Sequence, residues 1–225
     1  MNEKKLIITS MIGKYERPTD KFCIKKGYDY ILVTDKKFKT SCWKNIIIDF
    51  KNDNGLSNTK KQRYVKTHLY EMFPDYDVIT YVDANTTIDD NLYKYIEENK
   101  DKPITFKKHG SRDCIYDEIR ICVKVNKEKK DVGDRLRRRY ESEGYPKHNG
   151  LFENNVIILQ PQNKDVKKLF KLWWREIYYN SQRDQLSLNY VIWKYKLDSI
   201  VNISTTKKFR PKAHRIIWYQ VEFMI

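Results

Sequence analysis

The first third of the chain alternates short apolar runs with a segment of helical periodicity. Four apolar runs lie at residues 5–10, 28–34, 43–50 and 77–82. Nearly continuous apolar runs of this length are typical of strands buried on both faces. Residues 58–73, by contrast, place Val65, Leu69 and Met72 on one side of a helix. This alternation predicts a mostly parallel sheet with helices on both faces.

The second half of the chain continues the pattern less regularly. We expect strands at residues 103–107 and within 151–160, and helices at residues 129–143 and 164–179. The last is the clearest, because Val166, Phe170, Trp173 and Ile177 recur at helical spacing. A further helix is expected to begin near Asp184. One α/β domain spanning residues 1–225 accounts for all of these elements.

Composition agrees with a single globular domain. Hydrophobic residues make up 40% of 225, and only 7 glycines and 6 prolines are present, which leaves no room for a flexible linker. The longest apolar runs are far shorter than the roughly 18 residues of a membrane span. Four cysteines lack the spacing of a zinc or disulfide framework, and the amino terminus carries no secretory signal. We therefore expect free thiols and a cytoplasmic protein.

The net charge of +15 favours polyanionic ligands, although lysines spread over a solvated surface would give the same surplus. The alternative function that it suggests is a basic nucleic-acid-binding protein without catalytic activity. Such a protein needs basic and aromatic residues gathered on one face. The tyrosines instead occur throughout the predicted core segments, so we expect no nucleic-acid partner.

Polar residues follow several predicted strands, where open α/β sheets bind their ligands. These are Thr9 and Ser10 with the loop that contains Tyr15, then Asp35, and finally Asp83-Ala84-Asn85. A carboxylate and an amide oxygen two residues apart suit one divalent cation, which would bridge a diphosphate. The same residues also form the Asx turn that commonly ends a buried strand. Both interpretations of Asp83-Ala84-Asn85 stay open from the spacing alone.

Other polar residues allow two interpretations each. Asp184 would cap a helix, or its carboxylate would stabilise positive charge on a reacting sugar. Lys60 and Arg63 precede the fourth strand and would face a diphosphate or water. Arg112 and Asp113, with Glu118 nearby, would form a buried ion pair or bind sugar hydroxyls.

Four ordered strings carry a more specific signal. They are HGSRDCIYDE (residues 109–118), YESEGYP (140–146), NGLFE (149–153) and SQRDQLS (181–187). With them, residues 5–195 resemble the glycosyltransferase-like domain family that includes plant mucilage-related proteins. The resemblance implies a GT-A, Rossmann-like domain, with a nucleotide-binding part at about residues 1–100 and an acceptor and catalytic part at about 101–225. GT-A enzymes carry a D-x-D motif after the fourth strand. Here Asn85 replaces the second acid, so metal affinity without nucleotide should be low.

A second resemblance bears on mechanism. Glycogenin-type retaining transferases have an Asn beside a strand, an Asp-Gln pair opening a helix, and a Lys and a His near the carboxyl end; the matching residues are Asn155, Asp184, Gln185, Lys212 and His214. The resemblance implies that Asp184 and Gln185 are catalytic. It also implies that Mn²⁺ (or Mg²⁺) is held by Asp83, Asn85 and His214.

Together the resemblances imply metal-dependent, retaining transfer of a hexose from a UDP-linked sugar to a carbohydrate acceptor. The expected donor-binding residues are Thr9, Ser10, Tyr15, Asp35, Lys60, Arg63, Asp83, Ala84, Arg112, Asp113, Asn155 and Lys212.

Overall fold

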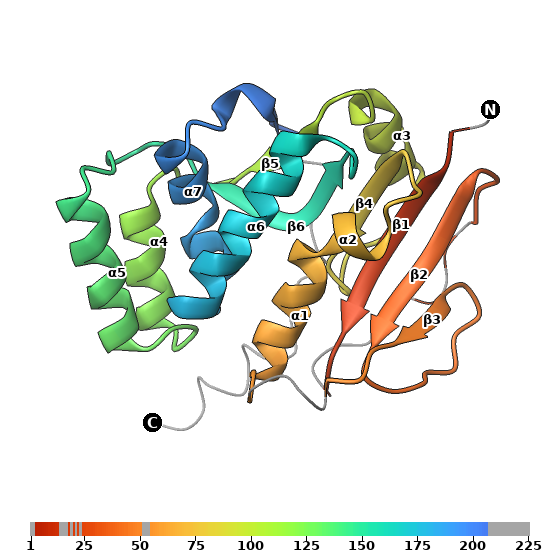
Figure 1. Cartoon of the computed structure of the whole chain (residues 1–225), viewed down its shortest axis with the longest axis horizontal. Helices are drawn as coiled ribbons and strands as arrows, with labels where there is room; N and C mark the ends of the chain where they lie inside the picture. Colours follow the sequence, from red (N-terminus) through yellow and green to blue (C-terminus); the bar gives the residue numbers. More distant parts are fainter. Residues whose placement is uncertain are drawn as a thin grey trace.

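The computed structural model describes residues 3–13, 18, 20, 22, 24–50 and 55–206. In this part of the chain one sheet runs in the order β3-β2-β1-β4-β6-β5-β7 (Figure 1). Its strands are β1 (Lys5–Met11), β2 (Tyr28–Thr34), β3 (Lys44–Ile47), β4 (Val78–Val82), β5 (Ile104–Lys108), β6 (Phe152–Leu159) and β7 (Val201–Ser204). Neighbouring strands are parallel except around β6, which is antiparallel to both β4 and β5. The predicted mostly parallel α/β sheet is confirmed.

Helices cover both faces of the sheet, as predicted, but unequally. They are α1 (Asn58–Thr67), α2 (Leu69–Met72), α3 (Asp90–Asn99), α4 (Ile115–Lys124), α5 (Lys130–Ser142), α6 (Lys164–Tyr179) and α7 (Leu188–Lys194), with 3₁₀ turns η1 (Asp184–Leu186) and η2 (Asp198–Ile200). Leu92 and Ile96 of α3 join a smaller core on one face. The other helices named here contribute to a larger core on the opposite face. The described molecule is therefore a three-layer α/β structure.

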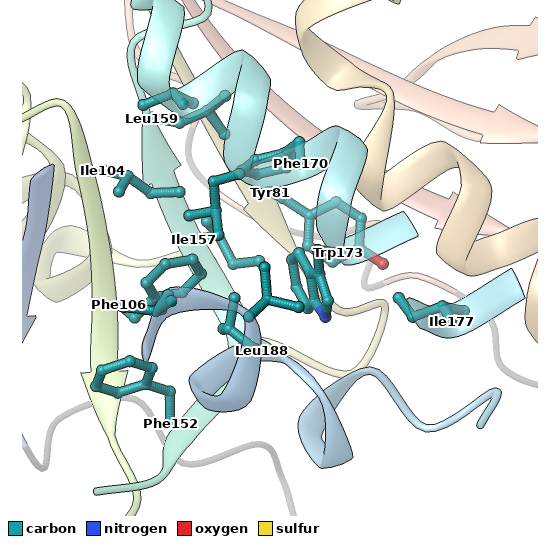
Figure 2. Close-up of a cluster of buried hydrophobic side chains, with 14 of the residues drawn as sticks. Tyr81, Ile104, Phe106, Phe152, Ile157, Leu159, Phe170, Trp173, Ile177 and Leu188 are labelled. Carbon is teal, nitrogen blue, oxygen red and sulfur yellow. The ribbon is translucent and has the colours of Figure 1, made fainter. Parts of the chain in front are cut away.

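The larger core is centred on α6. Figure 2 shows Phe170 and Trp173 of this helix packed over Tyr81 of β4 and Ile157 of β6. All four side chains are buried. The helix occupies the predicted residues 164–179, and the side chain of Asn163 caps it by accepting from the amides of Asp165 and Val166. Strong periodicity and a cap explain why this element was predictable.

The predicted helix at residues 58–73 is wrong in one respect, since it is two helices. Helix α1 ends at Thr67, and His68 departs from helical geometry with φ −114° and ψ 18°. The Thr67 hydroxyl donates to the Arg63 carbonyl at 2.8 Å, and His68 Nδ1 lies 2.8 Å from the Tyr64 carbonyl oxygen. Side chains that engage these carbonyls compete with continuation of the helix. The chain then restarts as α2, which buries Leu69 and Tyr70.

Several short elements differ from the expectations. Helices α3 and α4 were not predicted, because charged residues interrupt their short apolar patterns. The edge strand β7 was not predicted because its four residues, VNIS, are too few to show a period. The run at 43–50 forms a ladder only over Lys44–Ile47. The helix expected near Asp184 begins as the 3₁₀ turn η1, and α7 follows after Ser187. None of the helices in the described ranges combines the length and apolarity needed to cross a bilayer.

Candidate active site

The candidate site lies at one edge of the sheet, where β1, β2, β4 and β5 end and the antiparallel β6 begins. Asp83 follows β4 directly, and its amide donates to the carbonyl of Asn155 at 2.8 Å. The amide of Thr86 donates in turn to the Asp83 carbonyl at 2.8 Å. The segment Asp83-Ala84-Asn85 is thereby tied to the start of β6.

A buried lysine connects the two acids that the sequence singled out. The ammonium nitrogen of Lys66 lies 3.1 Å from Asp83 Oδ1, 2.9 Å from Asp184 Oδ2 and 2.9 Å from the Asn154 carbonyl oxygen. It also lies 4.6 Å from the centroid of the Tyr81 ring. The Lys66 side chain is only 1% exposed. Asp83 and Asp184, which come from distant segments of the sequence, therefore share one cation.

Asp184 is a buried, ionised carboxylate. Burial alone would raise its pKa, but the neighbouring charges of Arg63 and Lys66 hold the pKa well below its ordinary value. Arg63 Nε lies 3.3 Å from Asp184 Oδ1, opposite the oxygen that Lys66 contacts. The carboxylate therefore has a cation on each oxygen and carries its negative charge at neutral pH.

Gln185 and Asp184 are fixed within η1 by contacts to β6 and to the turn itself. The side-chain amide of Gln185 donates to the carbonyl of Phe152 at 2.9 Å. The Gln185 backbone amide donates to Asp184 Oδ1 at 3.1 Å. The N-cap position of η1 is Arg183, and its side chain makes no capping hydrogen bond to the turn. The Asp184 carboxylate instead pairs with Lys66 and Arg63, so the structure does not support the capping interpretation of this residue.

The loop after β1 is anchored beside the same edge. Asp35, at the end of β2, accepts from the Gly13 amide at 3.0 Å. Gly13 has φ +78°, and a Cβ at this position would lie 2.4 Å from Asn58 Nδ2, so the turn requires glycine. The Ser10 hydroxyl lies 3.2 Å from the Tyr81 hydroxyl, and Thr9 is fully buried.

Other predicted residues have different surroundings or lie outside the described ranges. The ammonium of Lys60 donates to the Tyr178 carbonyl at 2.7 Å, so it is directed towards α6 rather than towards Asp83. Arg112 pairs with the buried Glu118, as the ion-pair interpretation predicts. Asp113 instead contacts His148 at 2.9 Å on the surface. Tyr15, Lys212 and His214 lie outside the described residues.

Several amide groups beside Asp83 are buried without a hydrogen-bond partner among the described residues. Within the described residues, the Asp83 carboxylate accepts from Lys66. The buried oxygens Asn85 Oδ1 and Asn155 Oδ1 and both polar side-chain atoms of Asn154 find no hydrogen-bond partner there. Unsatisfied buried amide oxygens are suited to a metal ion or a ligand hydroxyl. Across the described part of the chain, no three His, Cys, Asp or Glu side chains lie close enough together to hold a metal ion.

Lys66 was missed in the sequence, although a signal for it exists. It stands three residues after Arg63, so both side chains share a face of α1. It also precedes Leu69 of the predicted apolar face by three residues, which places it beside that face and indicates a buried charge. Its two acidic partners are contributed by distant segments, which the spacing of residues along the chain does not reveal.

Comparisons with known proteins show which family the sequence matches. The model of the TOD1/MUCI70 glycosyltransferase-like domain family matches residues 19–217. No curated protein matches the chain in sequence. Among solved structures, the apo form of the bifunctional glycosyltransferase WbbM is similar, with a TM-score of 0.52 and 13% identity over 91% of this chain. The match spans 39% of WbbM, and at this identity it shows a shared GT-A fold alone.

Two further structures are more distant. Mouse xyloside xylosyltransferase 1 has a TM-score of 0.46 and 10% identity, covering 91% of this chain and 85% of its own. The galactosyltransferase LgtC, solved with donor and acceptor sugar analogues, has a TM-score of 0.46 and 12% identity, covering 88% and 73%.

Proposed function

The chain belongs to the TOD1/MUCI70 glycosyltransferase-like domain family, and on that premise we propose that it transfers a hexose from a UDP-linked sugar to a carbohydrate acceptor. The observation that carries the proposal is the buried Lys66 between Asp83 and Asp184. It joins the segment that would hold the diphosphate to the segment that would face the sugar.

The chain's own residues would divide the work by charge. Arg63 and Lys66 supply positive charge for an anionic diphosphate. The ionised Asp184 would lie beside the sugar and stabilise the positive charge that develops as the bond to the diphosphate breaks. Gln185, the side-chain amide of Asn154 and the side-chain oxygen of Asn155 would bind sugar hydroxyls. The Asn154 amide and the Asn155 oxygen have no hydrogen-bond partner among the described residues. The proposed stereochemical outcome is retention.

Asp83 and Asn85 are the residues proposed to hold Mn²⁺ or Mg²⁺. A cation bound there would offset the charge of the departing nucleoside diphosphate. One carboxylate and one neutral amide make a poor site by themselves, and Asp83 is already paired with Lys66. The diphosphate oxygens would complete the ligand set, together with His214, which is proposed from the family resemblance and lies outside the described residues. We therefore expect the metal to bind together with the nucleotide.

The test is a thermal-shift and turnover screen with UDP-glucose, UDP-galactose and UDP-N-acetylglucosamine, each with and without Mn²⁺. A ligand that binds the folded state raises the melting temperature. The expected result is a shift that needs both metal and nucleotide sugar, accompanied by release of UDP. If none of these sugars raises the melting temperature and none gives UDP release, the proposed donor is contradicted.

Replacing Asp83 with alanine should abolish metal-dependent turnover, because the cation loses its charged protein ligand. Turnover is measured as UDP release, and excess chelator should abolish the turnover of the wild-type protein in the same way. The matched control is Asp101→Ala, which removes an exposed carboxylate from the loop before β5 and should leave turnover unchanged. Full activity of the wild type in excess chelator would refute the metal assignment.

A further inference from the structure

The proposed reaction depends on a turn that is too short to hold its own shape. The 3₁₀ turn η1 spans only Asp184–Leu186. A single turn gains few internal hydrogen bonds for the residues that it orders. Outside contacts must therefore set the direction in which the Asp184 carboxylate and the Gln185 amide point.

Two buried side chains donate to the turn's backbone on either side of Gln185. The indole nitrogen of Trp173 donates to the Asp184 carbonyl at 3.0 Å, and the Tyr140 hydroxyl donates to the Leu186 carbonyl at 2.9 Å. Both side chains are fully buried. Figure 2 shows Trp173 enclosed by Tyr81, Ile157 and Leu188, with its nitrogen at the end of the ring away from Phe170. Resting on the proposed function, we infer that Tyr140 and Trp173 are positioning residues, which orient Asp184 and Gln185 for sugar transfer.

An ion pair fixes the distance between these two donors. Arg139, which precedes Tyr140 on α5, forms two hydrogen bonds of 2.9 and 2.8 Å with Glu176, one turn beyond Trp173 on α6. The Glu176 side chain is 8% exposed, so water screens this pair little. The Tyr140 ring also stacks on Tyr190 of α7, with centroids 4.0 Å apart. The two donors therefore belong to a braced pair of helices.

The arrangement separates two tasks. Helices α5 and α6 place the backbone of η1, while Lys66 and Arg63 of α1 hold the Asp184 carboxylate. A displacement of about 1 Å at a reacting group can reduce a rate by about a hundredfold. Releasing the backbone should therefore lower kcat, while donor affinity, which is proposed to depend mainly on the groups that bind the diphosphate, changes less.

Tyr140→Phe is the test, since it removes one oxygen atom and keeps the ring. We expect kcat for UDP release from the screened UDP-sugar with the highest turnover to fall about tenfold, with KM for that donor changed less than about twofold. Hydrogen exchange of the amides at residues 184–187 should become faster. The control is Tyr30→Phe, which removes a buried hydroxyl bonded to Tyr93 at 2.7 Å in the opposite core and should change neither quantity.

Glu176→Gln provides a second variant outside the turn. It weakens the pair with Arg139 and should lower kcat in the same direction, again without raising KM. Unchanged kcat in Tyr140→Phe, or an equal loss in Tyr30→Phe, would overturn the inference. If the wild-type protein releases UDP from none of the sugars, the proposed function fails. The rate of amide hydrogen exchange at residues 184–187 then tests the positioning role independently of turnover. Equal exchange rates in the wild type and in Tyr140→Phe would overturn that role.

Discussion

Lys66→Met should lower the free energy of unfolding by about 3–5 kcal/mol and abolish turnover. Removing one partner of a buried ion pair leaves the remaining charge without compensation, which costs about this much. Among the described residues, Asp184 would keep Arg63, at 3.3 Å, as its ion-pair partner, and Asp83 would lose its contact with the ammonium. Methionine fills a similar volume, so lost packing contributes little.

Urea denaturation at pH 7 measures this effect, and Lys168→Met on the exposed side of α6 is the control. The pH dependence checks the cause. Because the folded state lowers the pKa of Asp184, its contribution to stability is present above the ordinary carboxyl range and is lost as the pH falls through the lowered pKa. Without Lys66 that pKa should rise, so the variant should lose this contribution at a higher pH than the wild type. If Lys66→Met changes the free energy of unfolding by less than about 1 kcal/mol, the role of Lys66 as a buried ion-pair partner is contradicted.

Asp184→Asn should reduce turnover by about a hundred- to a thousandfold, the usual effect of removing one electrostatic group from a transition state. Asparagine preserves the size of the side chain but not its charge. Donor affinity should be retained, because Arg63 and Lys66 would still supply the positive charge proposed to bind the diphosphate. Turnover and donor binding by calorimetry, both measured well below the melting temperature, separate the two effects.

The control for this variant is Asp198→Asn. Asp198 also opens a 3₁₀ turn, η2, but its side chain is exposed. Turnover of Asp184→Asn close to that of the wild type would mean that the carboxylate serves only as a structural ion-pair partner of Lys66 and Arg63.

The sequence predicted the fold well where one element carries a strong pattern. The unbroken apolar runs predicted the strands of the sheet, and the apolar residues at helical spacing within 164–179 predicted α6. It failed where helices are short and mixed with charge, as in α3 and α4. It also failed at His68, because a helix break caused by side chains bonding to carbonyls leaves the apolar period intact.

For the site, the rule that ligands bind beyond the carboxyl ends of strands found Asp83 and Asp35. It did not indicate Asn154, because β6 runs the other way and brings its amino end to that edge. Nor did it indicate Lys66, whose role depends on Asp83 and Asp184 meeting in space. Such pairings are long-range, and a single sequence contains no record of them.

The ammonium between Asp83 and Asp184 means that the protein carries its own counterion. Two acidic groups can share a buried edge of the sheet before any ligand arrives, because the chain neutralises them internally. In the proposed reaction, folding and metal binding would then be separate events. The protein would lose a metal ion with each departing product and keep its structure until the next donor molecule binds. Chelation should therefore stop turnover while leaving the melting temperature of the unliganded protein unchanged.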